Sequence, residues 1–115
     1  MSPKGLEGPF TLTAETVKIA VTAKFPGVYA LGHSDMNGTF IVESVGRSNE
    51  NLQEPLQYLA AEFGGEFSYQ YSASAKEAFE KECELHHEFL ATTDAVHPNR
   101  VEGSYWKCPR CNVFD

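Results

Sequence analysis

The sequence lacks the features that mark membrane and secreted proteins. Its apolar runs are only a few residues long, whereas a membrane-spanning helix needs about 20 apolar residues. No apolar stretch follows the lysine near the N-terminus, so we expect no secretory signal. Cysteine is also scarce: the chain has three, an odd number that argues against a disulfide framework and favours a reducing compartment. We therefore expect a cytoplasmic protein that does not span a membrane.

Positive charge is scarce as well, and one stretch has none. The 115-residue chain has a net charge of −7 and a pI near 5.0, and residues 49–74 contain no lysine or arginine. The same stretch holds Glu50, Glu54, Glu62 and Glu66. Affinity for nucleic acid comes largely from basic side chains that neutralise phosphates. The acidic balance therefore disfavours nucleic acid, and the partners that we expect are another protein or a second copy of the chain in a homodimer.

What is present is enough for one hydrophobic core. With 42% hydrophobic residues and ordinary domain length, we predict a single domain over residues 1–115. The first helix is predicted over residues 13–24, with Thr13 as its N-cap. Two strands are predicted around Asn37 and Gly38, because Asn-Gly is one of the strongest hairpin signals.

A second helix is predicted from near Gln53 to Phe63, with Pro55 in its first turn. The alternating aromatic and polar residues 67–71 predict a third strand. A last helix is predicted from Ser74, its N-cap, to about Leu90. The fold class is therefore α+β, with a small antiparallel three-stranded sheet flanked by helices and a C-terminal tail containing a Cys-x2-Cys pair.

The last helix carries one residue that breaks its pattern. Continuing the apolar spacing from Phe79 to Leu85 places Glu82 on the same face. A carboxylate on a core-facing stripe costs free energy unless it is paired, protonated or bound to a metal. The alternative is that Glu82 lies at the edge of a wide stripe and reaches water. Both interpretations stay open from the sequence.

Two short motifs resemble the opening of a GIY-YIG nuclease domain. They are residues 27–29 (Gly-Val-Tyr) in the first hairpin strand and residues 45–47 (Val-Gly-Arg) at the end of the second. Residues 78–86 are similar to the helix pattern that carries the metal-binding glutamate of that family. The resemblance covers about residues 25–90 and leaves 91–115 as a tail. It implies that Tyr29 belongs to the catalytic site and that Glu82 holds Mg²⁺ or Mn²⁺.

The chain also departs from that family. Ser44 stands where the second tyrosine is expected, and Glu54 or Pro55 stands where the catalytic arginine belongs. Phosphodiester cleavage needs a cation aimed at the charge that develops on the phosphate, and Arg47 is the residue that could reach it. Whether the protein is an enzyme stays open between two functions. One is a catalytically degenerate binding or interaction module, and the other is a divalent-metal-dependent endonuclease using Tyr29, Arg47 and Glu82.

The tail contains a second candidate site. Cys108 and Cys111 have the spacing with which two thiolates grip one zinc ion. Imidazoles from His87 and His97 would complete a Cys2His2 set, and structural zinc would pin the tail against the last helix. His86 is an alternative ligand to His87, or a core histidine bonded to a backbone carbonyl.

Two other interpretations of the cysteine pair remain. The cysteines could be free thiols, or they could form a redox motif. A redox Cys-x2-Cys normally opens a helix, whose N-terminus lowers the thiol pKa. Only four residues follow Cys111 in this sequence, and we expect them to be too few for such a helix. Zinc binding is the prediction that we carry forward.

Overall fold

The computed structural model describes residues 5–89, 97–101 and 103–111. Within these residues a four-stranded antiparallel sheet has the order β1-β4-β2-β3. The strands are β1 (Glu7–Thr11), β2 (Gly27–Ser34), β3 (Phe40–Ser48) and β4 (Glu66–Tyr71). The helices of the same residues are α1 (Ala14–Ala20), α2 (Gln53–Glu62) and α3 (Ala75–Glu88). No helix among them is long and apolar enough to span a membrane.

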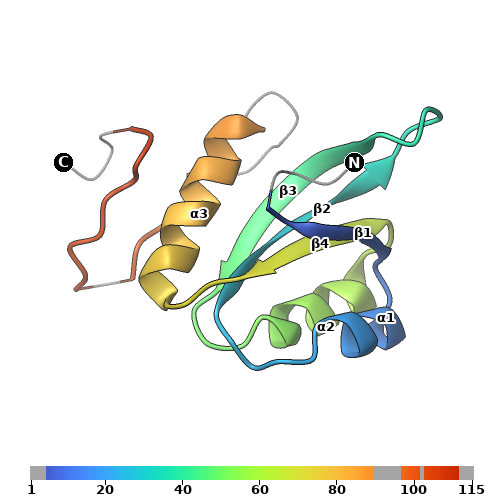
Figure 1. The fold of residues 1–115 in the computed structure, drawn as a ribbon, viewed down its shortest axis with the longest axis horizontal. Coiled ribbons are helices and arrows are strands. Elements are labelled where there is room, and N and C mark those ends of the chain that lie inside the picture. Colours follow the sequence, from blue (N-terminus) through green and yellow to red (C-terminus); the bar gives the residue numbers. More distant parts are fainter. Residues whose placement is uncertain (1–4, 90–96, 102, 112–115) are drawn as a thin grey trace.

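The helices cover the two faces of the sheet unequally. Helices α1 and α2 lie together on one face and α3 lies across the other, packed on β2 and β3 (Figure 1). The described part of the tail runs along α3 on the side away from the sheet (Figure 1). Helix α3 is thus packed between the sheet and the tail.

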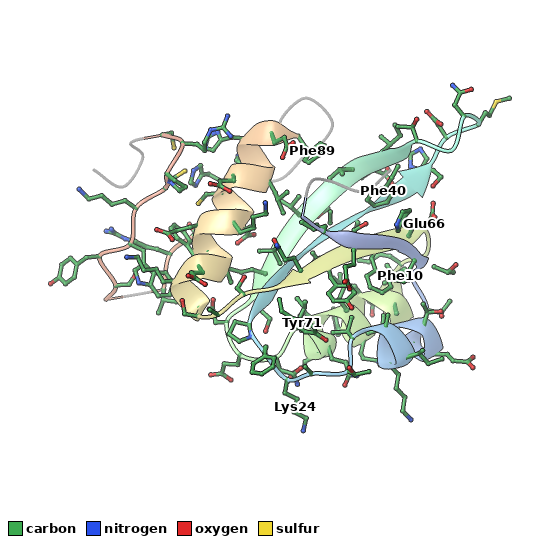
Figure 2. All side chains as sticks on the ribbon, in the orientation of Figure 1. Phe10, Lys24, Phe40, Glu66, Tyr71 and Phe89 are labelled. Atoms are coloured by element: carbon green, nitrogen blue, oxygen red, sulfur yellow. The ribbon has the colours of Figure 1, made fainter. Side chains whose placement is uncertain are left out.

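Each face of the sheet has its own apolar core. Phe10 and Tyr71 pack with Val17 and Leu56 on the side of α1 and α2. Phe40 packs on the opposite side, in the cluster that contains Val28 and Leu85 of α3. Figure 2 shows the labelled side chains of Phe10 and Tyr71 near α1 and α2, and that of Phe40 on the other side of the sheet. Alternation along each strand produces the two cores.

The predicted hairpin forms between β2 and β3. The Asp35 carboxylate accepts hydrogen bonds from the backbone N–H groups of Asn37 and Thr39, each at 2.9 Å. Gly38 has a φ of +80°, which a residue with a side chain rarely adopts. The resulting register places Tyr29 of β2 directly opposite Gly46 of β3.

Helix caps follow the sequence closely. The Thr13 hydroxyl accepts from the backbone N–H of Thr16 at 3.2 Å, and the Ser74 hydroxyl accepts from that of Glu77, also at 3.2 Å. In turn, the Glu77 carboxylate accepts a hydrogen bond from the backbone N–H of Ala73 at 3.1 Å. Both predicted N-caps therefore satisfy backbone donors that a helix leaves unpaired.

The sheet has four strands rather than the three that we predicted. The missed strand, β1, has five residues and includes Gly8 and Pro9, which are depleted in strands. Within the part of the chain that the structure describes it pairs only with β4, and an edge strand tolerates proline because one side of its backbone needs no partner.

The first helix is shorter than the predicted 13–24. It ends at Ala20, where the backbone N–H of Val21 bonds to the carbonyl of Val17. Helix α2 begins at Gln53 with Pro55 in its first turn, as expected, and ends at Glu62. Helix α3 ends at Glu88, and the predicted end near Leu90 lies outside the described residues.

Candidate functional site

Four possible metal ligands converge beside α3. They come from α3 and from two parts of the tail, and their ligand atoms all lie within 4.8 Å of one another: His87, His97, Cys108 and Cys111. The Sγ atom of Cys111 lies 3.3 Å from Nε2 of His97. These four side chains can hold a metal ion.

Packing between α3 and the tail brings the four residues together. The Trp106 ring lies on the Phe79 ring of α3, with centroids 5.6 Å apart. Arg100 donates from Nη1 to the carbonyl of Trp106 at 3.1 Å. Cys108 joins Phe79 and Cys83 in a small buried cluster. The cluster fixes the tail on the face of α3 that also carries His87.

The electrostatics of Cys108 favour its thiolate. Burial acts to raise the pKa of this thiol, but hydrogen bonds outweigh burial and lower the pKa to about 6. These bonds come from the backbone N–H groups of Arg110 and Cys111 and from the side chains of His97 and Cys111. The thiolate is the form that binds metals.

His87 has an unsatisfied ring nitrogen. Its Nε2 atom is buried and has no hydrogen-bond partner among the described residues. A buried polar atom without a partner costs about 1–3 kcal/mol, and a coordinated metal would remove that cost. The same holds for Nδ1 of His86, but the group of four that could hold a metal contains His87 and not His86.

Cys83 is a buried neighbour of this group. It is fully buried, and burial first, then Cys108 beside it, raises the pKa of its thiol well above the usual range. A neutral, buried thiol is a poor nucleophile. Cys83 therefore acts as a packing residue between α3 and Cys108.

The second candidate site is a cleft of about 680 Å³ between the end of β3 and the start of α2. Its lining combines two tyrosines, amides, carboxylates and one cation: Tyr29, Arg47, Ser48, Asn49, Glu50, Asn51, Glu54, Pro55, Tyr58 and Leu59. Tyr29 comes from β2 and Arg47 from β3. The cleft therefore brings together residues from three elements.

Arg47 is held by an ion pair with Glu82 of α3. Its Nη1 lies 2.6 Å from Oε1 of Glu82, and both side chains are only 12% exposed. Nε donates to Oδ1 of Asn49 at 3.0 Å, Nη2 donates to the carbonyl of Asn99 at 2.5 Å, and the guanidinium lies 5.1 Å from the centre of the Phe79 ring. Glu82 is thus a buried carboxylate with a charged partner, not an edge residue that reaches water.

The pKa of Glu82 reflects two opposing effects. Burial raises this pKa, while the hydrogen bond and charge of Arg47, and then the charge of His97, lower it, and the net shift is above the ordinary value. The ion pair therefore compensates only part of the desolvation of the carboxylate.

Tyr29 fills the space that Gly46 leaves open. A Cβ atom on Gly46 would lie 2.4 Å from the Oη and Cζ atoms of Tyr29, so this position accepts only glycine while the ring stays in place. Burial, followed by the nearby charge of Glu82, raises the pKa of Tyr29 to about 12. At neutral pH Tyr29 is a phenol that can donate a hydrogen bond but cannot act as a strong base.

The positions that depart from the nuclease motifs lie in the larger cleft and in a second hollow. Glu54 and Pro55, where the catalytic arginine is expected, line it. Ser44 lies instead in a neighbouring hollow of about 280 Å³ with Glu43 and Phe63. Among the described residues, Arg47 is the only lysine or arginine that lines the larger cleft.

Sequence reasoning missed the partners of Arg47. The Asn99 carbonyl belongs to the backbone, so the identity of the residue does not predict its contact with Arg47. The position of Phe79 in the sequence predicts only an ordinary core residue of its helix. Only the path of the tail past α3 brings Asn99 to Arg47.

Comparisons of the chain with known protein families, curated proteins and solved structures found no match.

Proposed function

We propose that this protein is a binding domain with a GIY-YIG-like architecture, a structural zinc ion and no nuclease activity. The observation that carries the proposal is the ion pair between Arg47 and Glu82. In the nuclease motif the glutamate holds a divalent cation, but here a guanidinium lies 2.6 Å from its oxygen. The buried carboxylate is paired with a cation of the chain itself, which takes the place that Mg²⁺ would have at Oε1.

Zinc is the metal that best suits the ligand group. Two thiolates and two imidazoles are the donors of structural zinc sites, whereas Mg²⁺ and Ca²⁺ take oxygen ligands. Four protein ligands complete a tetrahedron and leave no position for a reacting water. The zinc ion would therefore hold the tail on α3 without taking part in a reaction. A cytoplasmic location would keep Cys108 and Cys111 reduced.

The zinc proposal predicts one zinc ion per chain. We expect native mass spectrometry to find a single bound zinc in the purified protein and none in the Cys108→Ser or Cys111→Ser variants. Tyr105→Ser is the matched control, because Tyr105 lies in the same tail and is 91% exposed. A metal-free wild-type protein after refolding with excess zinc would refute the site.

The cleft beside Arg47 is the ligand site of the proposed binding domain. Its carboxylates, Glu50 and Glu54, are both exposed, and its single cation is paired with Glu82. A polyanion would meet repulsion there. Tyr58, 68% exposed at the rim, offers aromatic surface of the kind that protein interfaces use. The ligand that we propose is a segment of a protein partner or of a second copy of this chain.

A second function is favoured by one observation. Tyr29 and Arg47 line one cleft, Glu82 contacts Arg47, and burial followed by the charge of Glu82 raises the pKa of Tyr29. If the protein is a phosphodiesterase, Glu82 would bind Mg²⁺ or Mn²⁺, and the metal would activate a water molecule as nucleophile. Arg47 would have to leave Glu82 and turn towards the phosphate, and Tyr29 would donate a hydrogen bond.

A cleavage assay separates the two functions. We expect no cleavage of mixed single- and double-stranded DNA and RNA substrates with Mg²⁺ or Mn²⁺, and no salt-sensitive binding to them. Glu82→Gln, which keeps the shape of the side chain, is the control for contaminating nuclease. Metal-dependent cleavage by the wild type that disappears in Glu82→Gln would overturn the proposal in favour of the phosphodiesterase.

A further inference from the structure

We infer that the metal at the tail site positions Arg47 in the cleft, so that metal binding and the state of the cleft are coupled. The inference rests on the proposed zinc site and assigns it a second role besides stability. The guanidinium of Arg47 lies between α3 and the tail segment that contains Asn99. The metal ligands join the same two parts of the chain.

The tail forms one side of this arrangement. His97 is a ligand, and the carbonyl of Asn99, two residues further on, accepts the hydrogen bond from Nη2 of Arg47 at 2.5 Å. Pro98 between them has a fixed φ and is buried. Nδ1 of His97 also lies 2.9 Å from the Pro98 carbonyl. The His97 ring and the Asn99 carbonyl are therefore linked by a short, stiff stretch of backbone.

Helix α3 forms the other side. It carries Phe79, whose ring lies against the guanidinium, Glu82, which makes the ion pair, and the ligand His87. A metal that bridges His87 and His97 fixes the distance between this helix and the Asn99 carbonyl. The metal thereby fixes the relative position of α3 and the tail segment, the two parts of the chain that contact Arg47.

The tail reaches Arg47 by a second path through Trp106. This residue lies two positions before the ligand Cys108, and its ring packs on Phe79. Its carbonyl accepts from Arg100, which follows Asn99 in the tail. The Cys-x2-Cys pair and the segment around Asn99 are thus joined by direct contacts as well as by the metal.

Loss of the metal removes one of the links between α3 and the tail, and leaves the contacts of Trp106 and the neighbouring rings of His87 and His97, 5.3 Å apart. The Asn99 carbonyl is then held less firmly against α3, so the hydrogen bond from Arg47 to the tail weakens while Glu82 and Asn49 stay its partners. Linkage requires the reverse effect with equal size: if the metal favours the observed position of Arg47, then that position strengthens metal binding. The reverse effect can be measured without knowing the ligand of the cleft.

The test measures zinc affinity by competition with a chromophoric chelator. In the double variant Arg47→Gln/Glu82→Gln both charges are removed together, so no uncompensated charge stays buried. We expect zinc to bind about tenfold more weakly than to the wild type, within the range of 10- to 100-fold by which residues around metal ligands alter affinity. The matched control is His33→Gln/Glu43→Gln, which removes the other described ion pair, at the far end of the β2–β3 hairpin, and should change zinc affinity less than twofold.

A second measurement uses the wild-type protein and covers the case in which the double variant does not fold. The Nε–Hε signal of Arg47, identified by its loss in Arg47→Lys, is followed by NMR in zinc-loaded and chelator-treated protein. We expect the signal to move and its hydrogen exchange to accelerate when zinc is removed, while signals of β1 and α1 stay in place.

The outcomes separate the two proposals. If the wild type binds no zinc, the proposed metal site fails, and this inference fails with it. If zinc binds, but the double variant keeps wild-type affinity or the Arg47 signal is the same with and without zinc, the coupling alone is overturned. Val17→Ala, on the opposite face of the sheet, shows how far a general loss of stability alters zinc affinity.

Discussion

Removal of the metal is expected to lower the midpoint of thermal unfolding by about 15 °C. A ligand that binds only the folded state, at a thousand times its Kd, stabilises that state by about 4 kcal/mol, which corresponds to a shift of roughly this size for a domain of this length. The site joins α3 to the tail through His87, His97, Cys108 and Cys111, and the unfolded chain does not hold these four together. Calorimetry of zinc-loaded and chelator-treated protein measures the shift.

Ligand and non-ligand variants sharpen this prediction. Cys111→Ser should unfold at the same temperature as the chelated wild type and should not respond to added zinc. Tyr105→Ser, in the same tail and 91% exposed, should behave as the wild type does. Equal midpoints for loaded and chelated protein would show that the tail contributes nothing to stability through a metal.

Replacement of Arg47 by alanine is expected to lower the free energy of unfolding by about 3–5 kcal/mol at neutral pH. The variant leaves Glu82 buried without its partner, and an uncompensated buried charge has a cost of about this size. It also removes the donors to Asn49 and Asn99 and the contact with Phe79. Denaturation with urea at constant zinc concentration measures the loss.

The loss should depend on pH in a defined direction. Burial raises the pKa of Glu82, and without Arg47, which opposes this shift, the pKa rises further. A carboxyl whose pKa is higher in the folded state destabilises the fold above that pKa and ceases to do so as it takes up a proton. The difference between variant and wild type should therefore shrink as the pH falls through the raised pKa of Glu82. A difference that stays constant or grows on acidification would contradict the assignment.

Two further variants provide the controls. In Arg47→Ala/Glu82→Gln the buried charge is absent, so the part of the loss that comes from this charge should return, and the stability of the variant should no longer change with protonation of residue 82. His33→Ala removes a partner from the exposed ion pair with Glu43, in which both side chains are more than half exposed. Exposed pairs contribute about 0–1 kcal/mol, so this variant should stay close to the wild type.

Much of the fold follows from local sequence signals. Thr13 and Ser74 are N-caps because their hydroxyls satisfy nearby backbone donors, and Pro55 lies in the first turn of α2, where no backbone donor is needed. The Asn37-Gly38 turn gives the β2–β3 hairpin. These features involve neighbours within a few residues, so the sequence alone predicts them. Strand β1 was missed because its pairing with β4 joins residues far apart in the chain.

In the candidate sites, too, some features follow from local sequence and others from contacts between distant segments. From the amino-acid sequence alone, Glu82 falls on the apolar stripe of its helix, either facing the core or reaching water at the edge, and Cys108 and Cys111 are spaced for one metal ion. Three contacts depend on tertiary packing: Arg47 pairs with Glu82, His87 and not His86 joins the group of four, and the Asn99 carbonyl accepts from the guanidinium. Spacing along a helix or a turn is fixed by backbone geometry, whereas contacts between distant segments depend on how the sheet, α3 and the tail pack together.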